Sequence, residues 1–339
     1  MPRRSLSAVL ALTLAGTGCA AQARSSDTPT LKIGYFQGAV AGPEAVVAAD
    51  PGLSSRVKAK IELRPIDSGV AGMAQLRAGA FPVVSGVGNP PFVGAFSSGT
   101  DVEVVFAESI DESGLVVSDA IKSSADLRKV GVLVGSTLDF QLRGWLKSQG
   151  LAGKVQIASF ASEAAEAAAW KSHKIDAVYI SQAFLLELKK HGGRVLTTAA
   201  DIAKLGYAAV NLLAVSRPYA AKNPDVVQRL VCQISQAQTL VHGDQAARYV
   251  RPAARFLGVR PDDAVEATKS YPYIPAAEET GWLKGEDGTA SSGRLAANFQ
   301  RTAEFLVSQG RAKSVPPAAR IAAHIDPRFW DKAQAGGCS

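Results

Sequence analysis

The chain has 339 residues, of which 47% are hydrophobic and 20% charged, and its mean hydropathy is +0.07. This composition excludes an intrinsically disordered chain, because the apolar content is too high and the charge too low. The 31 glycines and 17 prolines are near the average for globular proteins, which excludes a collagen-like chain. The length predicts about two globular domains.

The first 23 residues have the pattern of a cleaved export signal. Arg3 and Arg4 form a basic start, residues 8–16 (AVLALTLAG) form an apolar run, and residues 21–23 (AQA) form a small-x-small cleavage site. We therefore predict a signal peptide at 1–23 and a periplasmic mature protein.

A second export pattern involves Cys19, which could carry a lipid anchor. A lipobox has leucine three residues before the cysteine, where this sequence has Gly16, so lipidation remains the alternative and a soluble exported protein the expectation. Cleavage would remove two of the 37 basic residues and none of the 30 acidic ones, lowering the net charge from +7 to +5. The remaining basic residues are scattered, and no nucleic-acid-binding face is predicted.

Two cysteines, Cys232 and Cys338, remain after such cleavage. An even count in an oxidising compartment permits a disulfide that ties the C-terminal tail to the helix carrying Cys232, and two free thiols are the alternative. The cysteine spacing fits no CxxC pattern, and the four histidines form no HExxH motif. We expect no metal site and no cofactor.

From residue 31 to residue 107, strands and helices alternate. Alternating or buried apolar runs predict the strands, and Pro43 at a first-turn position and Gly79 after a helix mark helix ends. The predicted strands are 31–35, 60–65, 83–84 and 102–107, and the predicted helices are 43–49, 71–78 and 91–96.

The same alternation recurs in the middle of the chain, and helices dominate after Pro218. Ser136 and Ser162 are placed to cap two helices. The predicted strands are 130–134, 155–158, 175–180 and 210–215. The predicted helices are 138–148, 163–171 and 182–191, followed by 225–241, 245–257, 261–270 and 295–309. Repeated strand–helix units predict an α/β fold with mostly parallel sheets.

Parallel-sheet topology places ligands at the carboxyl ends of strands, beside the amino ends of the following helices. Three such junctions carry small or polar residues, at 37–38 (QG), 88–90 (GNP) and 135–137 (GST). Free helix amides and the positive end of the helix dipole favour a carboxylate, phosphate or sulfonate at such junctions.

The order of these segments resembles that of the taurine, sulfonate and nitrate-type periplasmic binding proteins, the solute receptors of ABC importers. The runs SSADLRKVGVLVGSTLDF (123–140) and AAAWKSHKIDAVYI (167–180) carry most of the resemblance, which covers essentially the whole mature chain. It implies a two-lobed type II binding-protein fold that closes on a small anion. The first lobe would comprise 31–114 plus 216–339 and the second 115–215, with hinges near 115–118 and 213–216.

The resemblance and the junctions together give a candidate ligand set. Family receptors hold the anion with small polar residues and amides at the loop matching Gly88-Asn89-Pro90, where this chain departs from the usual Ser-Ser. Pro90 offers no N–H, whereas the turn at 135–137 matches well. The candidate ligand residues are Gln37, Asp67, Ser68, Gly88, Asn89, Pro90, Ser136, Thr137, Asp139, Ser181, Gln182 and Asn211.

Two departures concern the end of the ligand away from the anion. The acid that the family places in the strand VNLLAV, where it pairs with an amine, is Asn211 here, and Ser181-Gln182 replace an expected aromatic residue. Both departures predict a ligand with an uncharged or hydroxyl-bearing tail, because a neutral amide compensates an ammonium poorly. Asp139 or Asp67 could supply a replacement carboxylate. Nitrate and a pyrimidine precursor remain alternative ligands.

An enzyme is the alternative class. The sequence has no GxSxG, HExxH, P-loop or CxxC motif. The fold superfamily includes a pyrimidine synthase of thiamine biosynthesis, but that enzyme uses a Cys-rich motif that this chain lacks. We therefore predict a receptor and not an enzyme. It would act as a monomer and deliver taurine or another alkanesulfonate to the permease subunits of an ABC transporter.

Overall fold

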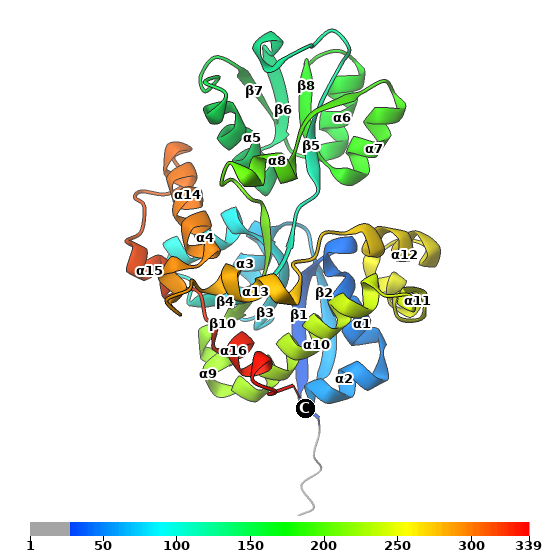
Figure 1. Ribbon diagram of the computed structural model, residues 1–339, viewed down its shortest axis with the longest axis vertical. Coiled ribbons are helices and arrows are strands. Elements are labelled where there is room, and N and C mark those ends of the chain that lie inside the picture. The colour runs from blue at the N-terminus through cyan, green and yellow to red at the C-terminus, as the bar shows by residue number, and fades with distance from the viewer. Residues whose placement is uncertain (1–27, 339) are drawn as a thin grey trace, which may run out of the picture.

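The computed structural model describes residues 28–338, which form two α/β lobes that the chain connects twice (Figure 1). The signal peptide predicted at 1–23, with Cys19, lies outside the described residues. Within the described part of the chain, no helix is long and apolar enough to cross a membrane.

The first lobe is built on a five-stranded sheet in the order β2-β1-β3-β10-β4. β1 pairs in parallel with β2 and β3, whereas β10 is antiparallel to both of its neighbours. Every residue of β3 is buried, as expected for a central strand covered by helices. The strands span Thr30–Phe36 (β1), Lys60–Ile66 (β2), Val83–Gly88 (β3), Val102–Ile110 (β4) and Val210–Ser216 (β10).

The second lobe repeats this topology in the order β7-β6-β8-β5-β9. β6 pairs in parallel with β7 and β8, and β5 is antiparallel to β8 and β9. The predicted two-lobed α/β fold is confirmed, and each sheet is mixed because one inner strand is reversed. The strands span Ser113–Val117 (β5), Lys129–Leu133 (β6), Gln156–Phe160 (β7), Ala177–Ser181 (β8) and Arg194–Thr198 (β9).

The helices begin where side chains satisfy their first amides. The Ser68, Ser136 and Ser162 hydroxyls each accept a hydrogen bond from an amide of the first turn. The helices that follow strands in the first lobe are α1 (Gly42–Ala49), α2 (Pro51–Val57), α3 (Gly69–Arg77) and α4 (Asn89–Ser97). Those of the second lobe are α5 (Thr137–Ser148), α6 (Glu163–Lys171), α7 (Gln182–Lys190) and α8 (Ala199–Lys204).

The C-terminal third is helical and packs on the first lobe (Figure 1). Phe92 and Phe96 of α4 pack against Phe299 of α14 with ring centroids 5.2 and 6.3 Å away, and Trp330 packs on Phe106 of β4 at 5.6 Å. The helices are α9 (Arg217–Lys222), α10 (Pro224–His242), α11 (Ala246–Leu257), α12 (Pro261–Ser270), α13 (Ala276–Leu283), α14 (Arg294–Ser308), α15 (Ala318–Ala322) and α16 (Arg328–Gln334).

The structure places the two crossings a few residues before the predicted hinges. The chain leaves the first sheet after β4 and enters β5 through residues 111–112, and it returns to β10 through residues 205–209. The predicted hinge at 115–118 falls largely in β5, and that at 213–216 lies inside β10. Both strands pair with neighbours on two sides, and the position of the hinges stays a prediction.

The segment from 194 to 204 forms two elements that the sequence analysis did not predict, β9 and α8. Thr198 and Asp201 form a capping box, in which the Thr198 hydroxyl accepts from the Asp201 amide and the Asp201 carboxylate accepts from the Thr198 amide. The Thr-x-x-Asp spacing at 198–201 is the sequence pattern that could have predicted the start of α8. β9 is a five-residue edge strand, and its apolar alternation is too short to predict a strand.

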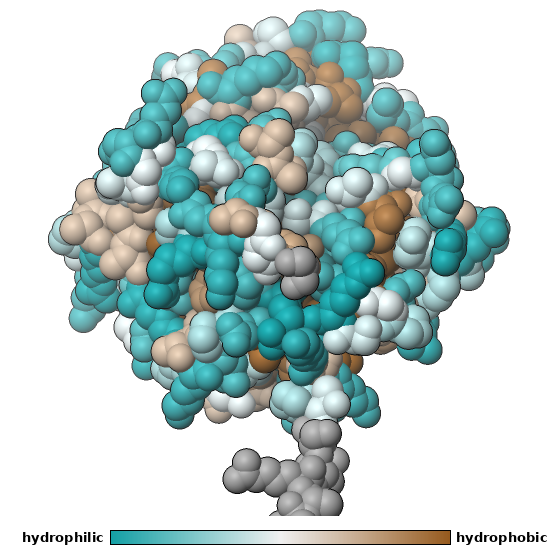
Figure 2. Space-filling model, turned by 60° about the horizontal axis from the view of Figure 1, so that its bottom comes forward, coloured by the Kyte–Doolittle hydropathy of each residue, from teal (hydrophilic) through white to brown (hydrophobic). Residues whose placement is uncertain are grey.

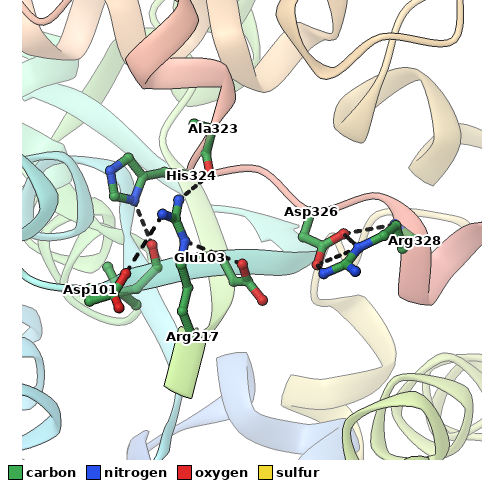
Figure 3. A network of polar contacts seen from close by, with 8 residues as sticks. Asp101, Glu103, Arg217, Ala323, His324, Asp326 and Arg328 are labelled. Atoms are coloured by element: carbon green, nitrogen blue, oxygen red, sulfur yellow. Dashed lines mark hydrogen bonds and ion pairs between the residues drawn. The ribbon is translucent and has the colours of Figure 1, made fainter. Parts of the chain in front are cut away.

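A polar network ties the C-terminal segment to the end of the first sheet away from the second lobe (Figure 3). The Arg217 guanidinium lies 3.6 Å from the Asp101 carboxylate and 3.3 Å from the Glu103 carboxylate, and donates to the Ala323 carbonyl. His324 contacts the backbone of β4 through Nδ1. The surface at this end is mostly hydrophilic, with scattered apolar patches (Figure 2).

A disulfide joins Cys232 of α10 to Cys338 near the C-terminus, across 106 residues of sequence. The structure thus favours the bonded pair over the two free thiols that the sequence left open. Because the loop is long, the bond removes much conformational freedom from the unfolded chain.

Replacing both Cys232 and Cys338 by alanine should lower the free energy of unfolding by up to about 4–5 kcal/mol, the chain-entropy value for a loop of this length. Urea denaturation of the oxidised wild type and of the double variant measures the difference. Wild-type protein that has been reduced should match the variant. Equal stability of oxidised and reduced wild type would show that the bond contributes nothing.

Glu166 is a carboxyl group buried beneath the second sheet. Its side chain is 0% exposed, and neither carboxyl oxygen has a hydrogen-bond partner among the described residues. Burial, with a smaller contribution from the charge of Glu163, raises the pKa of Glu166 to about 9. The folded protein therefore keeps this proton at neutral pH.

Stability should consequently fall as pH rises from about 5 to 9, because the unfolded chain releases the Glu166 proton while the folded chain retains it. The slope from this group approaches about 1.4 kcal/mol per pH unit. Glu166→Gln should remove that slope, whereas Glu304→Gln at an exposed position of α14 should not. Denaturation curves between pH 5 and pH 9 measure both, and parallel curves for wild type and Glu166→Gln would contradict the assignment.

Candidate ligand-binding site

Asp111 lies on the first crossing and connects the two lobes. Its carboxylate accepts a 2.7 Å hydrogen bond from the Thr137 hydroxyl of the second lobe and a 2.6 Å bond from the Asn211 amide of the first. The hydroxyl of Tyr271, in the segment after α12, lies 3.5 Å from the Asn211 amide nitrogen, beside this pair. Burial raises the pKa of Asp111, and its contacts with Thr137, Asn211 and Tyr271 oppose that rise.

The two lobes also meet directly. Thr137 is the first residue of α5, and a β-carbon added to Gly88 at the end of β3 would lie 2.5 Å from the Thr137 methyl. Gly88 pairs with Asn211 in the first sheet, so these contacts are contiguous with the Asp111 cluster. We call Gly88, Asp111, Thr137, Asn211 and Tyr271 the inter-lobe junction.

The turn before α5 keeps its shape through its own side chains. The Ser136 hydroxyl accepts from two first-turn amides and donates to a carbonyl of the preceding strand. The Asp139 carboxylate accepts from the Gly135 amide at 2.8 Å and pairs with Arg143 at 2.6 Å. Asp139 therefore has a cationic partner on its own helix, and this pairing favours a role in shaping the turn over that of a ligand carboxylate.

Asn89 is a structural residue. Its side chain is 0% exposed, donates to the Thr302 hydroxyl at 2.8 Å and accepts from the Val210 amide at 3.2 Å. It thereby fixes α4 against α14 and β10. The expectation that the Asn89 side chain faces a ligand is not met, and Pro90 beside it is buried as the second residue of α4.

Three candidates of the first lobe follow the carboxyl ends of β1 and β2, at the sheet edge where Gly88 ends β3. Gln37 is exposed and donates to the Phe256 carbonyl at 3.4 Å. Asp67 is exposed, and Ser68 caps α3 through a 3.1 Å bond from the Ala71 amide. A β-carbon added to the next residue, Gly69, would lie 2.6 Å from Pro91. A ligand role for Gln37, Asp67 and Ser68 stays a prediction.

Ser181 and Gln182 are next to the junction through the backbone. The Gln182 amide donates to the carbonyl of Glu112, the neighbour of Asp111, at 2.9 Å. The Ser181 amide donates to the Glu163 carboxylate at 2.8 Å. These two residues start α7 and hold the crossing against the second sheet.

Sequence reasoning missed Asp111, Tyr271 and Arg311. The signal for Asp111 was an acidic pair directly after a buried strand, which is where a parallel strand delivers functional side chains. Arg311 follows α14 in the first lobe, and its guanidinium packs directly against Gly135 of the second. Its sequence neighbours give no such signal, because the contact is made only in the folded chain.

A separate pocket of about 570 Å³ lies at the far end of the first lobe, beside the network of Figure 3. Two of its cations, Arg217 and Arg328, are paired with acids. Among residues 28–338 there is no group of three His, Cys, Asp or Glu side chains that could hold a metal ion. The inter-lobe junction is therefore the candidate ligand site.

Asn89→Ala should lower the free energy of unfolding by about 1–3 kcal/mol, because it leaves the buried Val210 amide and Thr302 hydroxyl without their partner. Asn298→Ala in α14, which removes one buried hydrogen bond to the Ala208 carbonyl, is the matched comparison and should cost less. Thermal and urea unfolding measure both variants. An Asn89→Ala protein as stable as wild type would contradict the structural role.

Known proteins resemble this chain in both sequence and fold. Residues 24–254 match the model of the NMT1-like family. The taurine-binding periplasmic protein of Escherichia coli K12 is 27% identical over 285 residues, which cover 81% of this chain and 86% of that protein.

Two solved structures show the same fold. The periplasmic aliphatic sulphonate binding protein SsuA from Escherichia coli superposes with a TM-score of 0.72 at 22% identity, covering 88% of this chain and 92% of that one. The nitrate-binding protein NrtA from Synechocystis PCC 6803 gives 0.65 at 12% identity, covering 91% and 89%. The family model spans well over half of the chain, and the predicted resemblance to taurine and sulfonate-type binding proteins is confirmed. This protein belongs to the NMT1-like family.

Proposed function

We propose that the protein is the solute receptor of an ABC importer, which binds a small organic anion of the taurine and alkanesulfonate class between its lobes and delivers it to the permease. The observation that carries the proposal is the inter-lobe junction, where Thr137 of one lobe meets Gly88 and Asp111 of the other. A ligand held there contacts both lobes and therefore favours their closed arrangement.

The anionic end of the ligand is assigned to the start of α5. The amino end of this 12-residue helix carries the positive end of its dipole. Arg311 brings a guanidinium from the first lobe against Gly135 in the same turn. A sulfonate between them would take charge-assisted hydrogen bonds from both lobes.

An apolar portion of the ligand is also supported. Phe36 at the end of β1 and Val134 after β6 are each 41% exposed, although both are large hydrophobic residues. They follow the carboxyl ends of strands, one in each lobe. This favours an organic anion with an alkyl segment over nitrate.

The Cys-dependent enzyme alternative has no support in the described chain. Cys232 and Cys338, the cysteines within residues 28–338, are bonded to each other. A disulfide offers no thiolate nucleophile. The bond also fits export to an oxidising compartment, and the taurine-binding relative is itself periplasmic.

Ethanesulfonate or taurine should stabilise the protein against thermal unfolding. A receptor gains about 2.7 kcal/mol at a ligand concentration 100 times the dissociation constant. Arg311→Gln should weaken binding about tenfold or more, since one charge-assisted hydrogen bond contributes about 1.5–3 kcal/mol.

Lys313→Gln, which removes an exposed cation two residues further along, is the control and should bind as wild type does. Calorimetric titration gives the affinities. Failure of taurine, ethanesulfonate and nitrate alike to bind would overturn the proposal, and equal losses in the Arg311 and Lys313 variants would overturn the assignment of the anion site.

A further inference from the structure

We propose that Asp111 is the counter-charge for a protonated amine on the ligand, so that the solute is an amino-substituted organic anion and not a plain alkanesulfonate. This inference rests on the proposed function and assigns the end of the ligand opposite the anion. It replaces the expectation, drawn from Asn211 in the sequence, of an uncharged tail.

The first argument is the missing partner charge. Asp111 is partly buried between the lobes, and none of the ion pairs within residues 28–338 involves it. Its hydrogen-bond donors, Thr137 and Asn211, are both neutral, and so is the neighbouring Tyr271 hydroxyl. A carboxylate removed from water without a counter-charge is costly, and a ligand ammonium would supply that charge.

The second argument is the position of the carboxylate relative to Asn211. The resemblance places an acid at position 211, and the amide at that position donates to Asp111 at 2.6 Å. Asn211 and Asp111 therefore form a pair of one amide and one carboxylate. The carboxylate lies on the chain crossing, whereas the resemblance places it in β10. An amine within reach of residue 211 is also within reach of Asp111.

The third argument is the acceptor capacity that remains. A carboxylate offers about four lone-pair sites, and the two neutral donors leave acceptor capacity free. The neighbouring Glu112 carboxylate has one buried oxygen without a partner among the described residues. Burial raises the pKa of the Tyr271 hydroxyl, and the negative charges of Asp111 and Glu112 add to that rise. The potential on this side of the junction is therefore negative and suits a cation.

The fourth argument is that one short turn meets both groups. Thr137 donates to Asp111 through its hydroxyl, and Arg311 packs on Gly135 two residues earlier in the chain. The negative and the positive group therefore contact the same turn before α5, which suits a short zwitterion with its amine and anion a few bonds apart.

The test compares taurine with 2-hydroxyethanesulfonate, in which a hydroxyl replaces the amine. Calorimetry on the wild type should show taurine bound at least about tenfold more tightly, the effect of one charge-assisted contact. Asp111→Asn should reduce this ratio to within about threefold. The ratio is the readout because a change at Asp111 also alters the contacts between the lobes, and so the affinity for both ligands. The exchange variant Asp111→Asn/Asn211→Asp returns the carboxylate to β10 and should restore the preference for taurine.

Asp119→Asn, at an exposed position after β5 of the second lobe, is the matched control and should leave the ratio as it is in the wild type. A wild-type ratio near one would overturn the proposal, and so would an unchanged ratio in Asp111→Asn or loss of the preference in Asp119→Asn. If neither sulfonate binds, the proposed sulfonate function fails. The ratio of 3-aminopropanoate to 3-hydroxypropanoate, measured in wild type and Asp111→Asn, then decides the role of Asp111 separately.

Discussion

The hydrogen bonds that converge on the Asp111 carboxylate hold the two lobes in their observed relation. One comes from Thr137 at the start of α5 and one from Asn211 in β10, and the Tyr271 hydroxyl of the C-terminal segment lies beside them. Asp111 itself lies on the chain crossing, so a single side chain links the crossing to both lobes. Because hydrogen bonds to an ionised group are stronger than neutral ones, changes in the charge state or the partners of Asp111 affect the relation between the lobes.

Around this cluster, most polar groups are used to fix local structure and not to meet a ligand. Ser136 and Asp139 satisfy the first turn of α5, and Asn89 joins α4, α14 and β10. Buried polar groups must be paired, and these pairs lie within a single lobe. They hold Thr137 and Gly88 in fixed positions on their own lobes, as a closure of the two lobes on a ligand would require.

The sequence predicted several parts of the molecule well, for identifiable reasons. Strands such as β1 and β10 show apolar alternation or continuous apolar runs, and Ser136 and Ser162 mark the starts of α5 and α6. Long-range pairing was harder to predict. The resemblance implied a hinge near 115–118, and the first three of these residues lie in an inner strand because β8 and β9 pair on either side. The sequence also does not show which side chains of a polar turn are buried, because that depends on distant partners. Asn89 is an example, since its partner Thr302 is 213 residues away.

The sequence by itself determined the α/β fold and the helical C-terminal region, because hydrophobic periodicity and helix caps are local properties of the chain. Its resemblance to solute receptors implied the two lobes. It did not determine which carboxylate lies at the inter-lobe junction. Asp67 and Asp139 were visible as acids near helix starts, yet the folded chain exposes one and pairs the other with Arg143. Only the tertiary structure brings Asp111 next to Asn211 from 100 residues away and leaves it without a cation among the described residues. The ionic partner of a side chain depends on which distant groups share its low-dielectric surroundings, and those surroundings exist only after the lobes have folded and met.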